Sequence, residues 1–359
     1  MTLVIPVVHS FTDLTHGAVA IHGGKGASLI TMTGAGMPVP PGFVITTGAF
    51  DEFRDASGLS ELIDSELDEL DVDDVTSVDA ASARIRAALQ EAPIPDSVRA
   101  QVHDAYDALV RRAGGETAVA VRSSATAEDL PDASFAGQQD TFLWIRGADS
   151  VKEHVRRCWA SLYTSRAITY RRSNRIDESN LSMAVVVQKM VNARAAGVAM
   201  TLDPATGDRS KVVIDASYGL GELVVSGTVT PDSTMLDKIT FAVVRQHLGE
   251  KARELVPEGD LLVERDVDAA RRGVPCLDAA ELRAVAALAK RAEKHYRVPQ
   301  DIEWAIDADL PDGENLLLLQ ARPETVHRAK PPTATVPQQA SASGFSLGSI
   351  TASLTRVSA

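Results

Sequence analysis

Cysteine and long apolar runs are scarce in this chain of 359 residues. Its two cysteines, Cys158 and Cys276, lie far apart and without the spacing of metal ligands, which excludes a metal-thiolate site. Two buried thiols fit a reducing compartment, so we expect a cytoplasmic protein. No apolar run approaches the roughly twenty residues that span a bilayer, and the N-terminus lacks the basic start and cleavage pattern of a signal peptide. The sequence therefore predicts no membrane partner.

Positive charge is also in short supply. The formal net charge is −13, from 36 Lys and Arg against 49 Asp and Glu. Nucleic acids and anionic membranes are bound through basic faces, so this charge excludes both as the main partner. Any phosphate site must therefore be a local basic island. With 45% apolar residues the chain is globular, and its length allows two lobes with a ligand cleft between them.

What the chain has instead is a strand that delivers an arginine to a polar loop. Val119 and Val121 alternate with small residues as in a short buried strand, which runs into Arg122. The guanidinium offers a fixed fork of donors that suits phosphate oxygens. An alternative interpretation pairs Arg122 with Glu128 or Asp129 in an ordinary loop. The segment adds further candidate phosphate ligands, the hydroxyls of Ser123, Ser124 and Thr126 and the backbone at Gly137.

A glycine turn near the N-terminus carries a lysine. Gly23 and Gly24 precede Lys25, and the sequence then predicts a short helix over Ala27–Thr33. Because a helix start favours an anion, Lys25 is a candidate phosphate ligand, although a solvated lysine is the simpler interpretation of this motif alone. A P-loop is excluded, since Gly26 stands where that motif needs serine or threonine.

One buried strand carries an amide. The segment MAVVVQKMV, Met183–Val191, is too apolar to be exposed, so the side chain of Gln188 needs a partner inside the protein. An adenine edge would supply that partner, and so would a backbone carbonyl.

Two strands near the end of the chain carry charged and amide groups. In Asp301–Asp307, alternation puts Glu303 on the face opposite Trp304. In Asn315–Thr325, Gln320 and Arg322 share one face. These groups form either a cross-strand polar set or a site in which oxygens hold Mg²⁺ and the arginine contacts phosphate.

The other elements follow from periodicity and composition. We expect a first strand at Leu3–Val8 and a solvated helix face and loop in the acidic run 51–79. An acidic insertion, Ala308–Glu314, lengthens the hairpin between the last two strands. Helices are predicted over 95–113, 151–172 and 279–296, a strand pair within 195–232, and a flexible Pro-, Ala- and Ser-rich tail over 328–359.

Four motifs together resemble one family. They are the arginine segment ending in Phe-Ala-Gly, Gly-Gly-Lys-Gly followed by Pro-Pro-Gly-Phe-Val, Pro-x-Thr-Gly followed by Gly-Leu-Gly-Glu, and Asp-Ile-Glu-Trp followed by Leu-Gln-Ala-Arg-Pro. They resemble the N-terminal domain of phosphoenolpyruvate synthase, pyruvate phosphate dikinase and rifampicin phosphotransferase. The resemblance implies an α+β, ATP-grasp-like fold with ATP in the cleft between two lobes, residues 1–190 and 191–327, followed by the tail 328–359.

The resemblance also implies roles for particular residues. Lys25, Arg122 and Arg322 would neutralise ATP phosphates and act in catalysis. Glu303 and Gln320 would hold Mg²⁺. Gln188 would lie at the hinge against the adenine, and Gly137 and Thr141 would complete the ATP-binding segment.

Members of this family continue into a domain with a phosphorylated histidine and a domain for the phosphoryl acceptor. None of the eight histidines here lies in such a motif, and His22 is interpreted as a loop residue. The chain therefore resembles the ATP-binding subunit of a two-component phosphotransferase. A histidine-bearing partner subunit would take the β-phosphoryl group to a small-molecule acceptor, releasing AMP and phosphate, as in enzymes that phosphorylate phenols, cresols or benzylic alcohols. The alternatives are a separated ATP domain of a phosphoenolpyruvate synthase or rifampicin phosphotransferase, and a nucleotide sensor without catalysis.

Overall fold

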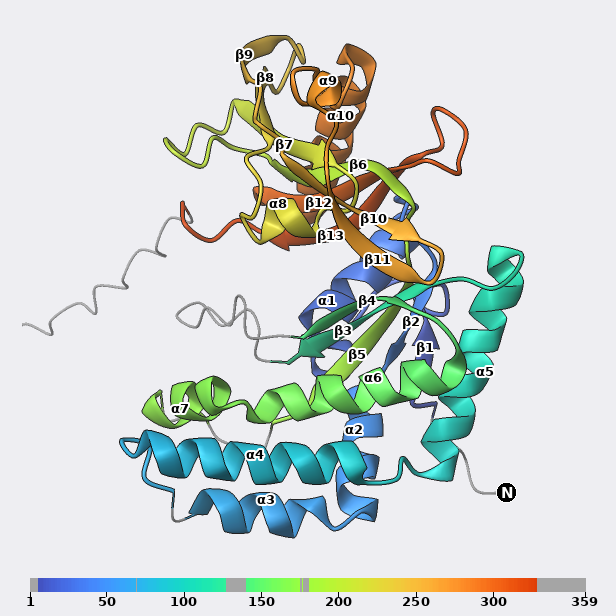
Figure 1. The fold of residues 1–359 in the computed structure, drawn as a ribbon, viewed down its shortest axis with the longest axis vertical. Helices are drawn as coiled ribbons and strands as arrows, with labels where there is room; N and C mark the ends of the chain where they lie inside the picture. The colour runs from blue at the N-terminus through green and yellow to red at the C-terminus, as the bar shows by residue number, and fades with distance from the viewer. Residues whose placement is uncertain (1–5, 69, 127–139, 175, 177–180, 328–359) are drawn as a thin grey trace, which may run out of the picture. The chain divides into compact units, whose positions relative to one another are not determined.

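The computed structural model describes residues 6–68, 70–126, 140–174, 176 and 181–327 (Figure 1). Helices and strands are mixed, which confirms the α+β class. Every strand pair in the described residues is antiparallel. The strands form two larger sheets and one separate hairpin.

The first sheet has five strands in the order β1-β2-β5-β3-β4. Strands β3 and β5 lie at its centre and are buried along nearly their whole length, which explains their runs of valine. The strands are β1 (Val8–Ser10), β2 (Gly42–Ile45), β3 (Val119–Ala125), β4 (Thr141–Ile145) and β5 (Met183–Lys189).

Helices are layered on one face of this sheet (Figure 1). Helix α6 packs on the strands, α4 packs on α6, and α3 packs on α4. Trp159 of α6 is fully buried and stacks on Phe53, with ring centroids 4.8 Å apart. The helices are α2 (Thr47–Ala56), α3 (Leu59–Asp68), α4 (Val75–Glu91), α5 (Asp96–Ala113), α6 (Ala148–Ala160) and α7 (Ser165–Ser173).

The prediction of one helix over 151–172 is wrong. Helix α6 ends at Ala160, a short 3₁₀ turn follows at Ser161–Tyr163, and α7 begins after Thr164. The hydroxyl of Thr164 accepts the N–H of Ala167 and caps α7, which makes the break favourable. Arg171 of α7 is 1% exposed and donates to the carbonyl of Leu162.

Helix α1 (Val19–Gly34) covers the opposite face of the first sheet and also contacts the second sheet. It is longer than the predicted helix Ala27–Thr33 and contains a kink at Gly23, whose φ of 65° is left-handed. His22 lies within this helix and is 2% exposed, so its interpretation as a loop residue is wrong. The first strand begins only at Val8, and residues 3–5 of its predicted range lie outside the described residues.

The second sheet has six strands in the order β13-β12-β6-β7-β8-β9. Helix α10 (Ala279–Tyr296) packs on one face of it and has the predicted bounds, set by a capping box between Asp278 and Glu281. The strands are β6 (Ala193–Met200), β7 (Lys211–Tyr218), β8 (Asp232–Asp237), β9 (Val243–His247), β12 (Gln300–Asp307) and β13 (Leu316–Pro323).

A two-stranded hairpin, β10 (Arg253–Glu258) and β11 (Leu261–Asp266), is separate from both sheets. Its tip contacts β4, since Trp144 donates to the carbonyl of Gly259 at 3.4 Å and Arg146 pairs with Asp260 at 3.5 Å. Two helices are short: α8 (Glu222–Val225) precedes β8, and α9 (Ala269–Arg272) follows β11.

Both cysteines are buried and free. The strands of the first sheet end at Lys189 and those of the second begin at Ala193. The division into lobes at residue 190 stays a prediction, and the tail 328–359 lies outside the described residues.

Candidate functional site

Arg122 joins the two sheets. From β3 of the first sheet, its Nη2 donates to Gln320 Oε1 at 2.6 Å and lies 3.4 Å from Glu303 Oε2. Glu303 on β12 and Gln320 on β13 are directly opposed in the second sheet, so their side chains lie on one face. The structure therefore brings together a residue predicted for phosphate and the two predicted for metal. Glu128 and Asp129, the partners in the alternative interpretation, lie outside the described residues.

The same face carries two more carboxylates that the sequence analysis missed. Asp301 is paired with Arg322 in register, and the Arg322 Nε lies 3.8 Å from its Oδ2. Burial raises the pKa of Asp301, and Arg322 opposes that shift. Asp215 of β7 shares a register row with Glu303 through the intervening strand β6. Asp301 lies two residues before Glu303, so the alternation of a strand alone predicts that it shares the face of Glu303. Asp215 lies on another strand, and its position follows only from the order of the strands in the sheet.

The turn that carries Lys25 is fixed to the Arg122 strand. Ser124, two residues after Arg122, accepts the N–H of Gly26 at 3.1 Å and donates to the carbonyl of His22 at 2.9 Å. A side chain at Gly23 would not fit, because its Cβ would lie 1.9 Å from the Ser124 carbonyl oxygen. Lys25 is therefore held, half-buried, beside the strand that presents Arg122.

The hydroxyls predicted to bind phosphate have partners within the protein. Ser124 donates to the carbonyl of His22 in the glycine turn. Ser123 donates to the carbonyl of Asp140 at 3.2 Å, and Thr126 donates to that of Ser182 at 3.3 Å. In these contacts they stabilise the local backbone. Thr141 is the register partner of Arg122 on β4 and is exposed, and Gly137 lies outside the described residues.

Gln188 is 2% exposed, and its amide nitrogen lies 3.5 Å from the carbonyl of Pro40. A backbone carbonyl is thus the partner of the Gln188 amide, which is one of the two possibilities that the sequence left open. A contact between Gln188 and adenine stays a prediction. Close by in the chain, Met190 and Val191 belong to an apolar cluster that the sequence analysis did not identify. The cluster also contains Ala193, Ala196, Leu220, Leu255, Leu262, Ala305, Leu317 and Leu319.

Glu303 and Gln320 fit a magnesium ion in donor type. Both present oxygen, and directly opposed strand residues have Cβ atoms about 5 Å apart. Within the residues that the structure describes, no group of three or more His, Cys, Asp or Glu is placed to hold a metal. An ion here would take its other ligands from phosphate and water, as Mg²⁺ commonly does.

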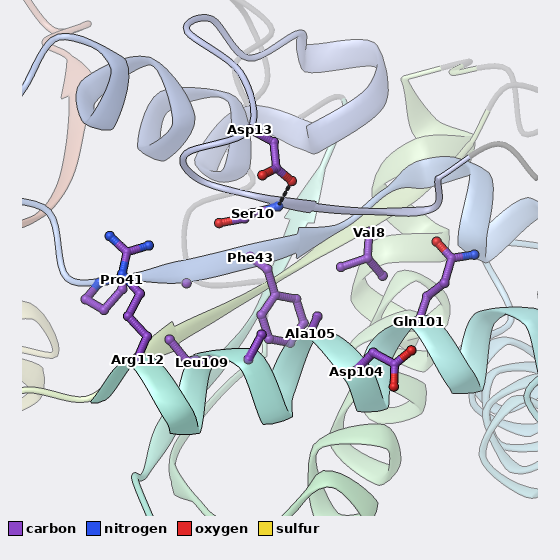
Figure 2. A pocket seen from close by; sticks show the side chains of 12 residues that line it. Val8, Ser10, Asp13, Pro41, Phe43, Gln101, Asp104, Ala105, Leu109 and Arg112 are labelled. Atoms are coloured by element: carbon purple, nitrogen blue, oxygen red, sulfur yellow. Dashed lines mark hydrogen bonds between the residues drawn. The ribbon is translucent and has the colours of Figure 1, made fainter. Parts of the chain in front are cut away.

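A cavity of about 390 Å³ lies elsewhere, between the edge of the first sheet and α5 (Figure 2). Phe43, Val8 and Leu109 form its apolar part, and Asp104 and Arg112 line it from α5. None of the residues predicted to bind nucleotide lines this cavity.

No helix in the described part of the chain is both long and apolar enough to cross a bilayer.

Known proteins were compared with this chain. The family described as pyruvate phosphate dikinase, AMP/ATP-binding domain, matches residues 19–342. A probable phosphoenolpyruvate synthase of Methanothermobacter thermautotrophicus is 45% identical over 322 residues, which cover 89% of this chain and 46% of that protein. The phosphoenolpyruvate synthase of Aeropyrum pernix is 40% identical over 345 residues, covering 89% and 42%. That of Pseudomonas aeruginosa is 45% identical over 320 residues, covering 85% and 40%. The chain thus spans less than half the length of these relatives.

Proposed function

The chain belongs to the family of the pyruvate phosphate dikinase AMP/ATP-binding domain, and from that premise we propose that it binds Mg-ATP at Arg122, Glu303 and Gln320 and serves a dikinase-type phosphotransfer. The observation that carries the proposal is the convergence of these three side chains from two sheets. The three side chains contact one another, as a structural polar set would. They also place a guanidinium, a carboxylate and an amide oxygen at one point, which is a donor set that suits a metal-bound polyphosphate.

The residues act by positioning and by electrostatics. Arg122, Lys25 and Arg322 supply positive charge for the phosphate oxygens, with Arg122 offering its planar fork. Glu303 and Gln320 hold Mg²⁺, which supplies charge neutralisation of the triphosphate when bound. The apolar cluster around Met190 gives the base a place to pack, with Gln188 at the neighbouring strand end.

The transfer needs a nucleophile that we assign to a histidine outside this chain, on a partner subunit or on a further domain. A nitrogen of that histidine bonds to the β-phosphorus, the bond from the β-phosphorus to the oxygen of AMP breaks, and AMP leaves. Water then takes the γ-phosphoryl group as phosphate, so each ATP and water give AMP, phosphate and phosphohistidine. Phosphohistidine next passes its group to an acceptor oxygen.

The acceptor that similarity favours is pyruvate. The relatives are named phosphoenolpyruvate synthase, although the chain covers less than half of each. The phenol, cresol or benzylic alcohol expected from the sequence stays a prediction without support from these names. We therefore propose an ATP-binding part of a phosphoenolpyruvate synthase-type enzyme.

The test uses ATP labelled separately at its β- and γ-phosphates. The chain is incubated with Mg²⁺, labelled ATP and a purified histidine-bearing domain of a phosphoenolpyruvate synthase. We expect AMP to form only with both proteins present, β-label on the histidine domain and γ-label in free phosphate. Binding of ATP without any AMP, whichever acceptor domain is supplied, would contradict transfer and favour a nucleotide sensor.

A further inference from the structure

Two histidines meet beside the glycine turn. His9 Nδ1 on β1 lies 2.9 Å from His22 Nε2 on α1, and His22 is 2% exposed. The other ring nitrogen, His22 Nδ1, lies 3.0 Å from the amide nitrogen of Ala18 and 3.1 Å from its carbonyl oxygen. Gly23, the kink residue, follows directly. The imidazole therefore ties the first turn of α1 to the edge strand at the point where the helix bends.

One neutral tautomer of His22 satisfies the amide of Ala18. The amide is a donor only, so in this tautomer Nδ1 accepts its hydrogen, the ring proton lies on Nε2, and Nε2 donates to His9 Nδ1. Protonation of His22 puts a hydrogen on Nδ1 and exchanges the bond from the Ala18 amide for a bond to the Ala18 carbonyl oxygen, 3.1 Å away. Burial and the nearby His9 lower the pKa of His22, and the bond to the Ala18 carbonyl opposes them.

The pair lies in line with the proposed phosphate site. His9, Val44, Val186 and Arg122 are successive register partners across four strands of the first sheet, so their side chains share one face. The glycine turn crosses that face, because a Cβ at Gly26 would lie 3.1 Å from both methyl carbons of Val44. The turn is thus anchored on one side by the imidazole of His22 and on the other by Ser124, whose hydroxyl binds the His22 carbonyl.

We propose that His22 is a positioning residue for Lys25, an inference that rests on the proposed function. Neutral His22 fixes the backbone on the N-terminal side of the kink, so that Lys25 is presented to the ATP phosphates without further ordering. A missing imidazole removes this anchor, and a protonated one exchanges the Ala18 amide for the Ala18 carbonyl. The consequence is a weaker grip on the phosphates and an unchanged grip on the nucleoside.

The group whose charge acts on His22 is His9 on β1, and Lys25 follows three residues later on α1 itself. Because the folded protein holds His22 at a lowered pKa, the anchor persists at the ordinary histidine pKa near 6.5 and is lost only as the pH falls through the lower pKa of the folded protein.

Three substitutions separate the two contacts of the ring. His22→Asn keeps an acceptor near the Nδ1 position, His22→Gln keeps a donor near the Nε2 position, and His22→Leu keeps neither. Dissociation constants for Mg-ATP and for adenosine are measured by calorimetry at pH 8 and pH 6, together with thermal melts. The exposed His103 on α5, changed to Leu, is the control for loss of a histidine.

We expect His22→Leu to weaken Mg-ATP binding about 3- to 10-fold at pH 8, the loss of roughly one hydrogen bond, and to leave adenosine binding unchanged. His22→Asn should recover most of the loss. Because the pKa of His22 is lowered, the ratio of ATP affinities between wild type and His22→Asn should change less from pH 8 to pH 6 than the titration of a free histidine would give. Equal losses for ATP and adenosine, or wild-type ATP binding in His22→Leu, would overturn the role of His22. A wild-type protein that binds no Mg-ATP at pH 8 would instead overturn the proposed function. If His22→Leu does not fold, His22→Gln, which loses the acceptor for the Ala18 amide, decides through the ATP-to-adenosine comparison.

Discussion

Arg122 on β3 and Gln320 on β13 are joined by a 2.6 Å hydrogen bond, although 198 residues separate them in the chain. The guanidinium side chain is 12% exposed and also lies 3.4 Å from the Glu303 carboxylate. Such a contact between two sheets is worth little to stability if its only role is structural, because the polar groups must first be dehydrated. In the proposed site its value lies in preorganisation, since the guanidinium proposed for phosphates is already placed beside the oxygens proposed for a metal.

Substitution of Arg122 tests the centre of the site. We expect Arg122→Ala to lower phosphoryl transfer by about 10²–10³-fold, the usual cost of losing one preorganised donor to a developing charge. Arg122→Lys should give an intermediate rate because it keeps the charge and loses the planar fork. Arg99→Ala is the matched control, since Arg99 is an exposed arginine on α5 paired with Asp96. A fully active Arg122→Ala enzyme in the labelled-ATP assay would refute the site.

Two glycines share one backbone angle but differ in their surroundings. Gly23 and Gly58 both have φ of 65°, but a Cβ at Gly23 would lie 1.9 Å from the Ser124 carbonyl, whereas at Gly58 nothing lies within 4 Å. Gly58→Ala should cost only about 1–2 kcal/mol for the left-handed conformation. Gly23→Ala should cost more and abolish Mg-ATP binding, because the turn that holds Lys25 must move. Urea unfolding and calorimetry measure both, and equal costs for the two variants would contradict the close contact.

Much of the site follows from the sequence, because it depends on local alternation. The alternation of side chains along a strand is enough to predict the faces on which Glu303, Gln320 and Arg322 lie. The apolar stripe and the capping box are enough to predict helix α10. The broken helix after Ala160 could not be predicted in this way. Apolar residues continue across the break, and periodicity alone does not show that Thr164 caps a second helix through the N–H of Ala167.

Contacts between distant segments explain the other failures. The burial of His22 depends on His9 and on the kink at Gly23, and the kink depends on Ser124, about a hundred residues away. Likewise, nothing local to Arg122 indicates Gln320 as its partner. Residue types identified the chemistry, but only the order of the strands in the two sheets could assemble it.

Asp301 gives a prediction for pH. Its side chain is half-buried, which raises the pKa of the carboxyl, and its buried Oδ1 has no hydrogen-bond partner among the described residues. The folded protein therefore binds this proton more tightly than the unfolded chain does. Stability is lost as the pH rises through the ordinary carboxyl range and stays lost above the raised pKa. Asp301→Asn avoids this cost, so the variant should unfold at a higher temperature than wild type at pH 8.

The advantage of Asp301→Asn should shrink toward pH 4, where wild-type Asp301 also carries a proton. Asp64→Asn, an exposed position on α3, serves as the control and should show no such trend. Thermal melts across this pH range measure both variants. A destabilised Asp301→Asn protein at pH 8 would mean that Arg322, whose Nε lies 3.8 Å from the carboxylate, outweighs burial.

A buried ion pair supports the segment that leads into the hairpin β10–β11. Lys251 is fully buried, and its Nζ donates to Asp232 and to the carbonyls of Gly249 at 3.0 Å and Arg272 at 2.9 Å. Asp232 also accepts the N–H groups of Gly249 and Cys276. Lys251→Met should lower the free energy of unfolding by about 3–5 kcal/mol, because it leaves a buried carboxylate without its cation. The double variant with Asp232→Asn should lose less unfolding free energy than Lys251→Met alone, since the uncompensated charge is gone.

Lys211→Met is the control. It removes ion pairs of 3.7 and 4.0 Å near the surface and should cost under about 1 kcal/mol. Urea unfolding measures all three, and a double variant that is less stable than Lys251→Met would show that the main-chain contacts of Asp232, and not its charge, hold this segment in place.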